Sequence, residues 1–432
     1  MPIFSPHLER ASFCLMEKES LGTESQSRRN YILFTIAIFT SFAIVGIAET
    51  IRSTALPRIQ SEFNLTELHL GILLAVNATG YLLTCTFTAA LSKKIGIKTC
   101  HILGLFLIFV GGVCIFFSPT FPFLLLGFFI LNLSFGILEI ANGVIAAKIF
   151  TKNTGTMMNL AHFAYGAGAT LAPIISTSIM AVRFSDQISS WRFVYLFALS
   201  FAVLPMIPVI MGRLAKKIDN PRDKSGYFLL LKKPIMWFII MILFFSLVAE
   251  SGIVSWMVAF LETSHDYSED SAAFHLTLYF VCFTLSRLLL GPFIDRFGFI
   301  NSLIVVTFFA GVMITLGVLL GRGGSLFIVL SGIGVAPIFP TVMAVLAKLF
   351  SDAIEIAMTT LLTFTGTFMI FANLTVGGVI NHARVAFTAS HGEVGVAMAF
   401  SVGFLIFGIA CFCACAFSLV LRHKQKKSGK LV

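Results

Sequence analysis

Long apolar runs separated by short polar segments make up most of this chain. A run of about twenty residues, at about 1.5 Å of helix rise per residue, is long enough to cross the ~30 Å hydrocarbon core of a bilayer. Backbone polar groups find no partner in lipid, and no short alternating strands of the barrel type occur, so we predict helices. The pattern predicts an all-α integral membrane protein with twelve transmembrane helices, at residues 31–55, 69–91, 101–118, 122–147, 157–182, 193–212, 235–261, 272–294, 302–320, 325–347, 357–381 and 395–421.

The pattern also repeats at a spacing of about two hundred residues. Residues 147–150 read AKIF and residues 347–350 read AKLF, while the Ala-Glu pair at 48–49 recurs at 249–250. A shared offset over several helices indicates two six-helix bundles in parallel repeat, an arrangement that places a substrate site between the bundles near the midplane. We therefore divide the chain into a cytoplasmic tail, a bundle, a basic cytoplasmic linker, a second bundle and a basic cytoplasmic tail, at residues 1–30, 31–212, 213–234, 235–421 and 422–432.

The composition excludes a soluble protein. Hydrophobic residues make up 57% of the chain and charged residues 12%, against about 25% charged residues in soluble domains. The net charge of +10 does not indicate nucleic-acid binding, because the basic residues lie between the apolar runs. Eight cysteines form no recognisable metal or disulfide pattern. The expected partners are the lipid bilayer and a small-molecule substrate, with no nucleic acid, no metal and a monomeric state.

The distribution of basic residues predicts the orientation. With both termini in the cytoplasm, 23 of the 30 Lys and Arg residues fall in inner segments and six in outer segments, while Arg287 lies within a span. Short cytoplasmic loops of membrane proteins carry an excess of Lys and Arg. We expect a multi-pass protein of the cytoplasmic (inner) membrane, with both termini inside.

Three carboxylates lie inside the predicted spans, at Glu49, Glu139 and Glu250. An ionisable group in the membrane costs a few kcal/mol, and such groups commonly mark ion or substrate pathways. A carboxyl group in a low-dielectric site can exchange a proton in the physiological range. These three residues are our proton-coupling candidates; carboxyls that only fix helix packing are the alternative.

Polar residues near Glu139 supply candidates for substrate binding. Asn142 follows Glu139 by three positions and shares its helix face. In the next span, Asn159 and Tyr165 lie three positions either side of His162. Amides, an imidazole and a phenol suit a hydroxyl-rich ligand. Trp256 is a further candidate that could stack on a sugar ring, although a tryptophan at the membrane interface is an equal alternative.

Residues 291–298, GPFIDRFG, resemble the G-x-L-a-D-R-x-G loop of the major facilitator superfamily. The resemblance implies that Gly291, Asp295, Arg296 and Gly298 form a conformational-switch loop. The counterpart in the first half, residues 89–96, has Lys93 where the family usually has Asp.

Two further segments resemble the fucose-permease-like branch of this superfamily. Residues 138–142, LEIAN, resemble its L-E-T-A-A-N segment, and residues 158–163, MNLAHF, resemble its L-N-L-A-Q-x-F segment. The branch has an acidic residue near the end of the first helix, where this chain has Ser53. The resemblance implies a sugar transporter. It does not imply that fucose is the substrate, and because Ser53 replaces the acidic residue of the first helix, it does not identify the proton-coupling residue.

These observations predict a secondary active transporter of a small polar, sugar-like metabolite, working by alternating access as an H⁺-coupled symporter. It would need no cofactor beyond an ion gradient. The alternative is an exporter or antiporter of drugs or a siderophore-like metabolite, to which the partial antiporter motif at residues 168–173 and the 47 phenylalanines point. A membrane enzyme or sensor is disfavoured, since no metalloprotease, nucleophile-elbow or phosphate-loop motif occurs.

Overall fold

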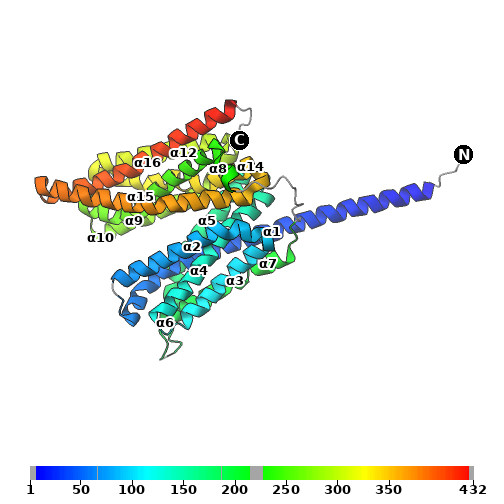
Figure 1. The fold of residues 1–432 in the computed structure, drawn as a ribbon, viewed down its shortest axis with the longest axis horizontal. Coiled ribbons are helices and arrows are strands. Elements are labelled where there is room, and N and C mark those ends of the chain that lie inside the picture. Colours follow the sequence, from blue (N-terminus) through cyan, green and yellow to red (C-terminus); the bar gives the residue numbers. More distant parts are fainter. Residues whose placement is uncertain (1–5, 66, 186, 215–226, 428–432) are drawn as a thin grey trace.

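The computed structural model describes residues 6–65, 67–185, 187–214 and 227–427 (Figure 1). Within these ranges all regular secondary structure is helical. Eleven helices are long and apolar enough to cross a membrane, and a twelfth crossing is the pair 274–289 and 291–297, bent by 51°. The predicted all-α membrane fold is confirmed.

The helices form two bundles that follow each other along the chain (Figure 1). The N-terminal bundle contains α1 (Pro6–Phe63), α2 (Glu67–Ile95), α3 (Ile97–Phe116), α4 (Phe121–Ile149), α5 (Thr154–Ala181), α6 (Ser190–Ser200) and α7 (Met206–Met211). After the short α8 (Tyr227–Leu231), the C-terminal bundle contains α9 (Pro234–His265), α10 (Glu269–Leu289), α11 (Gly291–Phe297), α12 (Phe299–Leu319), α13 (Ser325–Val335), α14 (Ile338–Leu349), α15 (Ile354–His391) and α16 (Glu393–Lys427). Most of the predicted linker, residues 215–226, lies outside the described residues.

Several helices differ from the predicted spans in ways that proline explains. A proline lacks the backbone N–H and clashes with the preceding turn. The predicted span 193–212 is divided into α6 and α7 near Pro205, and the span 325–347 into α13 and α14 at Pro337. The segment predicted as an N-terminal tail, residues 1–30, is helical from Pro6 onward and continues directly into α1 (Figure 1).

In the part of the chain that the structure describes, the two bundles contact each other toward one end. We call the end that carries Lys148, Lys348 and Lys427 the basic end, and the opposite end the far end. Figure 1 shows the bundles converging where the C terminus lies and diverging away from it. One buried apolar cluster contains residues of both bundles, including Val144 and Met358. The two other clusters are each confined to one bundle. Apolar packing therefore seals the basic end.

Small residues bring α1 and α5 into direct backbone contact within the N-terminal bundle. A Cβ atom at Gly46 would collide with the carbonyl oxygen of Tyr165, and one at Gly168 with the carbonyl oxygen of Ala43. Small residues at such spacing allow close helix approach in membranes, where packing rather than the hydrophobic effect holds helices together.

A polar network ties α1 to α6 at the far end. The Arg192 side chain, buried at 8% exposure, donates hydrogen bonds to Glu62 Oε1 from Nε (3.0 Å) and Nη2 (2.7 Å). Its Nη1 donates to the carbonyl oxygen of Phe116 at 2.9 Å, so the end of α3 joins the network. Trp191 Nε1 donates to Glu62 Oε2 at 2.6 Å.

Burial raises the pKa of the Glu62 carboxyl, but hydrogen bonds from Ser189, Arg192 and Trp191 outweigh burial and hold the pKa below its ordinary value. A carboxyl whose pKa is lowered on folding stabilises the fold above its ordinary pKa, and this stabilisation is lost as the pH falls through the folded-state pKa. Glu62 therefore stabilises the far end at neutral pH.

We expect Glu62→Gln to lower the thermal unfolding temperature at pH 7. The free energy of unfolding should fall by about 1–3 kcal/mol, as is typical when a hydrogen bond to a charged group is lost. The difference from the parent protein should shrink as the pH is lowered below 4.5, the ordinary pKa. Glu262→Gln is the matched control, because Glu262 lies near the corresponding end of α9 and makes no ion pair with a described residue. Equal losses in both variants would contradict a role for the network.

Candidate functional site

Glu49 is held by a residue from a neighbouring helix. Tyr165 of α5 donates a hydrogen bond from its hydroxyl to Glu49 Oε2 of α1, at 2.7 Å. The Glu49 side chain is exposed, whereas Tyr165 is half-buried. The structure thus brings together a proton-coupling candidate and a substrate-binding candidate. A carboxylate beside a phenol can accept and donate hydrogen bonds to a hydroxyl ligand.

Glu139 in α4 and Glu250 in α9 are half-buried, and neither forms a hydrogen bond or ion pair with a described residue. They lie in different bundles, yet both are close enough to Arg287 of α10 to interact with it electrostatically. Glu139 is also within electrostatic range of Glu49. Glu139, Glu250 and this arginine therefore form one cluster of charges where the bundles meet, and Glu49 joins it through Glu139.

Arg287 is the charged residue that connects the two bundles in this cluster. Its side chain is 5% exposed and lies over the ring of Phe283, with 4.3 Å from Cζ to the ring centroid. Nε donates to the carbonyl oxygen of Ala336 in the C-terminal bundle at 3.0 Å. Nη1 donates a longer hydrogen bond, 3.4 Å, to the carbonyl oxygen of His162 in the N-terminal bundle. In the sequence, Arg287 stands out as the arginine inside the predicted span 272–294, but the pattern alone does not indicate its role.

The cluster carries excess negative charge when all its carboxylates are ionised. Glu139 and Glu250 share the guanidinium of Arg287, and Glu49 adds a third carboxylate within electrostatic range of Glu139.

His162 lies at the seam between the bundles. Its imidazole packs against Phe42 of α1, with ring centroids 4.7 Å apart, and against Phe339 of α14, at 5.1 Å. The side chain is 8% exposed. The imidazole is thus surrounded by aromatic rings from both bundles, next to the carbonyl group that Arg287 binds.

The two asparagine candidates face other parts of the N-terminal bundle. Asn142 is buried and accepts a hydrogen bond from Ser41 Oγ at 2.8 Å, and Ser41 lies 3.2 Å from Nε2 of His101. Asn159 is buried and donates to the carbonyl oxygen of Gly155 in its own helix at 2.9 Å. The structure does not bring either amide beside Tyr165.

Trp256 lies on a different face of α9 from Glu250. It lines a cavity of about 290 Å³ together with Ser251 and Ser255 of α9, Val376 of α15 and Phe407 of α16. The α9 positions that line this cavity, 248, 251, 252, 255 and 256, are related by steps of three and four and form one helix face. Glu250 lies two positions from both 248 and 252, on the opposite face, so Trp256 is separated from the carboxylate cluster.

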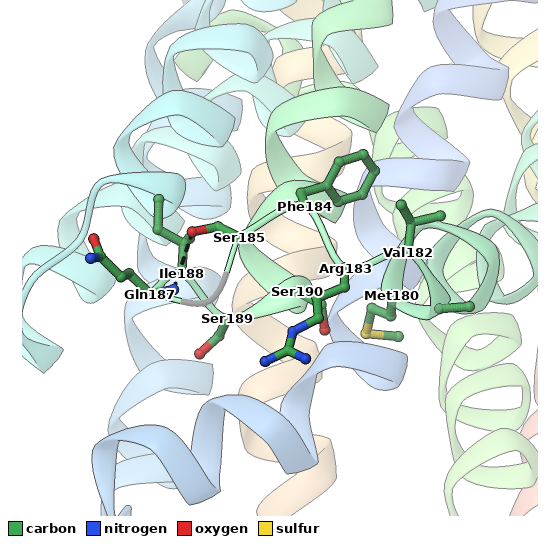
Figure 2. A pocket seen from close by; sticks show the side chains of 10 residues that line it. Met180, Val182, Arg183, Phe184, Ser185, Gln187, Ile188, Ser189 and Ser190 are labelled. Atoms are coloured by element: carbon green, nitrogen blue, oxygen red, sulfur yellow. Dashed lines mark hydrogen bonds between the residues drawn. The ribbon is translucent and has the colours of Figure 1, made fainter.

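A hollow of about 340 Å³ at the far end belongs to the loop between α5 and α6. Figure 2 shows its lining, which runs from Met180 to Ser190. Ser185 Oγ accepts a hydrogen bond from the backbone N–H of Gln187 at 3.1 Å, which folds the loop on itself. The lining contains none of the three carboxylate candidates, so this hollow is separate from the charge cluster.

Asp295 of α11 caps the N-terminus of α5 from the opposite bundle. Its Oδ1 accepts from the backbone N–H of Gly155, and its Oδ2 from that of Thr156, both at 2.7 Å. The Thr156 hydroxyl adds a third hydrogen bond at 2.6 Å. These are the backbone donors that an N-cap side chain normally takes, and Asn153 at the N-cap makes no such bond. The negative charge also lies at the positive end of the helix dipole.

Glycine makes this contact possible on both sides. A Cβ atom at Gly155 would lie 2.9 Å from Asp295 Oδ1, and one at Gly291 would lie 2.7 Å from Cα of Thr156. Gly298 ends α11 at φ +89°, a conformation that favours glycine. Arg296, by contrast, is exposed and binds no described residue. Within the predicted switch loop, the carboxylate and the glycines make the cross-bundle contact.

The repeat-related contact at the basic end uses different residues. Glu355, in the first turn of α15, accepts hydrogen bonds from Ser92 of α2 and from Lys148 Nζ, the latter at 3.0 Å. Lys348, the repeat partner of Lys148, donates to the carbonyl oxygen of Thr151 at 3.2 Å. Both lysines of the AKIF/AKLF repeat thus cross between the bundles. Lys93, at the end of α2, occupies the position that corresponds to Asp295, and the carboxylate at this contact is instead that of Glu355 in α15.

Comparison with known proteins supports this architecture. A family model of the Major Facilitator Superfamily matches residues 38–324. Bypass of stop codon protein 6 of Saccharomyces cerevisiae is 22% identical over 299 residues, 61% of this chain and 58% of that protein. The L-fucose-proton symporter of Escherichia coli is 24% identical over 173 residues, 39% of each chain. The chain thus covers less than two thirds of the length of either relative.

Solved structures match over nearly the whole chain. The E. coli fucose:proton symporter FucP has a TM-score of 0.76 at 17% identity, covering 91% of this chain and 99% of FucP. The proton:xylose symporter XylE has a TM-score of 0.72 at 16% identity, covering 92% and 96%. These likenesses show a shared fold, and the family is one of transporters rather than enzymes. With two thirds of its length matched by the family model, the chain belongs to the major facilitator superfamily.

Proposed function

We propose that this protein is a proton-coupled symporter of a small, polar, sugar-like metabolite. The observation that carries the proposal is the cluster of Glu139 and Glu250 around Arg287 at the junction of the two bundles, with Glu49 beside Glu139 and bonded to Tyr165. Carboxylates with excess negative charge in a membrane can carry protons, and Glu49 with Tyr165 offers hydrogen bonds to a hydroxyl. Two fold relatives, FucP and XylE, are described as proton symporters of sugars, which is consistent with this function.

The closed basic end defines the state from which transport would start. Basic residues favour the cytoplasmic side, so sealing of the basic end corresponds to a state open to the outside. Substrate and proton would enter from the far end and reach the carboxylate cluster. Closure of the far end and separation of the basic end would then release both into the cytoplasm of the cell, across the inner membrane.

Proton binding can permit the conformational change by reducing charge. An ionised Glu139 opposite Arg287 resists movement of one bundle against the other, because opposite charges in a low dielectric attract strongly. A protonated Glu139 attracts Arg287 less. It also lowers the cost of enclosing the site away from water on both sides. Substrate hydroxyls bound near Glu49 would provide the remaining hydrogen bonds.

The direct test is uptake into vesicles that contain the purified protein, over a panel of radiolabelled monosaccharides, with and without an imposed pH gradient. We expect at least one sugar to accumulate only when the outside is more acidic. Uptake that ignores the gradient would exclude proton coupling. Export of apolar compounds driven by the entry of protons would instead favour the antiporter alternative.

Glu139→Gln should abolish accumulation while retaining movement down a gradient. Glutamine keeps the size and hydrogen-bonding capacity of glutamate but cannot bind a proton. With a gradient of one pH unit, coupling to one proton can sustain an accumulation of about tenfold, whereas the variant should stop at equal concentrations. The measurement is the steady-state ratio of internal to external sugar concentration. It is combined with the rate at which labelled sugar exchanges across the membrane when the two concentrations are equal.

Glu49→Gln and Glu250→Gln serve as comparisons, since the repeat makes these residues positional equivalents. If Glu49 binds substrate, its variant should lose affinity and keep its response to the gradient. Wild-type accumulation by Glu139→Gln would rule out the role of Glu139 in coupling. Loss of exchange as well as accumulation would indicate a binding or structural role instead.

The charge cluster predicts that Arg287 and Glu139 stabilise the protein cooperatively. Arg287→Gln should lower the unfolding temperature markedly, because it leaves the carboxylates without a counter-charge. Adding Glu139→Gln should restore part of the loss, with a coupling of about 0.5–3 kcal/mol as found for interacting residues. The control pairs Arg287→Gln with Glu262→Gln, which should be additive. Additivity in both pairs would show that the two charges do not interact.

Asp295→Asn should destabilise the sealed basic end. The substitution removes the negative charge at the helix terminus, an effect of about 0.3–1 kcal/mol, or up to roughly fivefold in the open population. A cysteine introduced at Met358, which is 1% exposed between the bundles, should then react faster with a maleimide in an otherwise cysteine-free protein. Asp266→Asn, at the far end, should leave the rate unchanged. An unchanged rate for Asp295→Asn would show that this loop does not hold the closed state.

A further inference from the structure

The C-terminal bundle lacks the close helix contact that its repeat partner has. In the N-terminal bundle, Ala43 and Gly46 of α1 pack against Gly168 and Ala169 of α5. At the offset of 201 that relates Glu49 to Glu250, the corresponding residues of α9 and α15 are large, namely Phe244, Leu247, Met369 and Ile370. Helices with bulky residues at the contact cannot approach as closely as those with small residues.

The space between these bulkier helices is hollow. A cavity of about 510 Å³ lies between α9, α15 and α16, with an apolar lining that includes Phe244, Phe371, Val376 and Ile409. Its volume is within the range of small-molecule sites, about 300–1,000 Å³. The smaller cavity beside Trp256 shares Val248 and Val376 with it, so the two adjoin. No charged residue lines either cavity.

Polar groups without partners gather at one end of this space. Ser251 Oγ is buried and has no hydrogen-bond partner among the described residues. The side chains of Ser255 and Trp256, which line the same small cavity, form no hydrogen bond with a described residue either, although the Trp256 ring packs against Phe400 at a centroid distance of 6.1 Å. Elsewhere in α9 the hydroxyl of Ser246 donates to its own helix, at Ile242. A hydroxyl without a partner is costly in a membrane, so these groups suit a hydrogen-bonding, uncharged ligand.

The depth of the cavities matches one leaflet. Lys233 precedes α9 and marks the membrane boundary at the basic end. About twenty residues of helix cross the hydrocarbon core, which places Trp256 and Ser255 near the opposite boundary. Tryptophan is enriched at such boundaries. Phe371 and Ile409 on the rim of the larger cavity are 64% and 59% exposed, which is expected of side chains that contact lipid chains.

We propose that this space is a binding site for a bilayer lipid with an uncharged, hydroxyl-bearing head group, taken from the leaflet at the far end. One acyl chain occupies the apolar cavity between α9, α15 and α16. The head-group hydroxyl bonds with Ser251, Ser255 and the indole N–H of Trp256. The site is separate from the carboxylate cluster, because Glu250 lies on another face of α9.

The test uses full-length protein in phosphatidylcholine vesicles that contain a photoreactive lipid. One sample contains a diacylglycerol with a diazirine in its acyl chain, and the other a phosphatidylcholine with the same labelled chain at the same mole fraction. After irradiation, mass spectrometry of the digested protein locates the labelled residues. We expect the diacylglycerol to label the cavity lining of α9, α15 and α16 several-fold more than the phosphatidylcholine.

Three variants test the site directly. Ser251→Ala should reduce the preference for diacylglycerol by about fivefold, the loss expected for one hydrogen bond. Ser246→Ala, a serine with its own partner in the same helix, should leave the preference unchanged. Ala372→Phe should fill the larger cavity and abolish labelling of its lining. Equal labelling by both lipids would show only bulk lipid contact, and absence of label from the lining would show that no lipid enters; either result overturns the proposal.

Discussion

Hydrocarbon offers no hydrogen-bond partners, so each polar group placed in the membrane must find its partner within the protein or carry a function. Many serine and threonine hydroxyls of the described helices meet this constraint by donating to a carbonyl of their own helix, as Thr307 does. Arg287 meets it by binding backbone carbonyls of both bundles. Glu139 and Glu250 form no hydrogen bond or ion pair with a described residue, and we propose that they bind protons.

The same constraint acts on the ends of helices. The first N–H groups of a helix have no partner within it, and in α5 two of them are satisfied by Asp295 of the other bundle. A capping interaction that usually stabilises a helix locally is used here to join two bundles. On the repeat-related side, the partners are Glu355, Ser92 and Lys148. The internal repeat thus preserved the place of the contact while its chemistry diverged.

The sequence allowed the fold to be predicted because span length and loop charge are properties of local composition. The repeat offset also indicated residues that the structure places in equivalent roles, since Lys148 and Lys348 both cross between the bundles. Side-chain partners were less accessible, because each residue turns a helix face by about 100° and helix rotation depends on packing. Asn142 and Glu139 share a face by spacing, yet Asn142 bonds with Ser41 inside the bundle. Arg287 could have been identified from its charge within a span.

One helix, α5, connects the Asp295 contact between the bundles to the charge cluster. In α5, Gly155 and Thr156 bind Asp295, and His162, less than two turns further on, binds Arg287 through its carbonyl oxygen. The intervening residues, 157–161, include neither glycine nor proline, so this stretch of about 10 Å behaves as a stiff rod. A shift of the α5 N-terminus away from Asp295 would therefore displace, in the same movement, the His162 carbonyl oxygen that Arg287 binds. The contact at Asp295 and the charge cluster would then be coupled mechanically, through the rigid backbone of α5, without a chain of side-chain contacts between them.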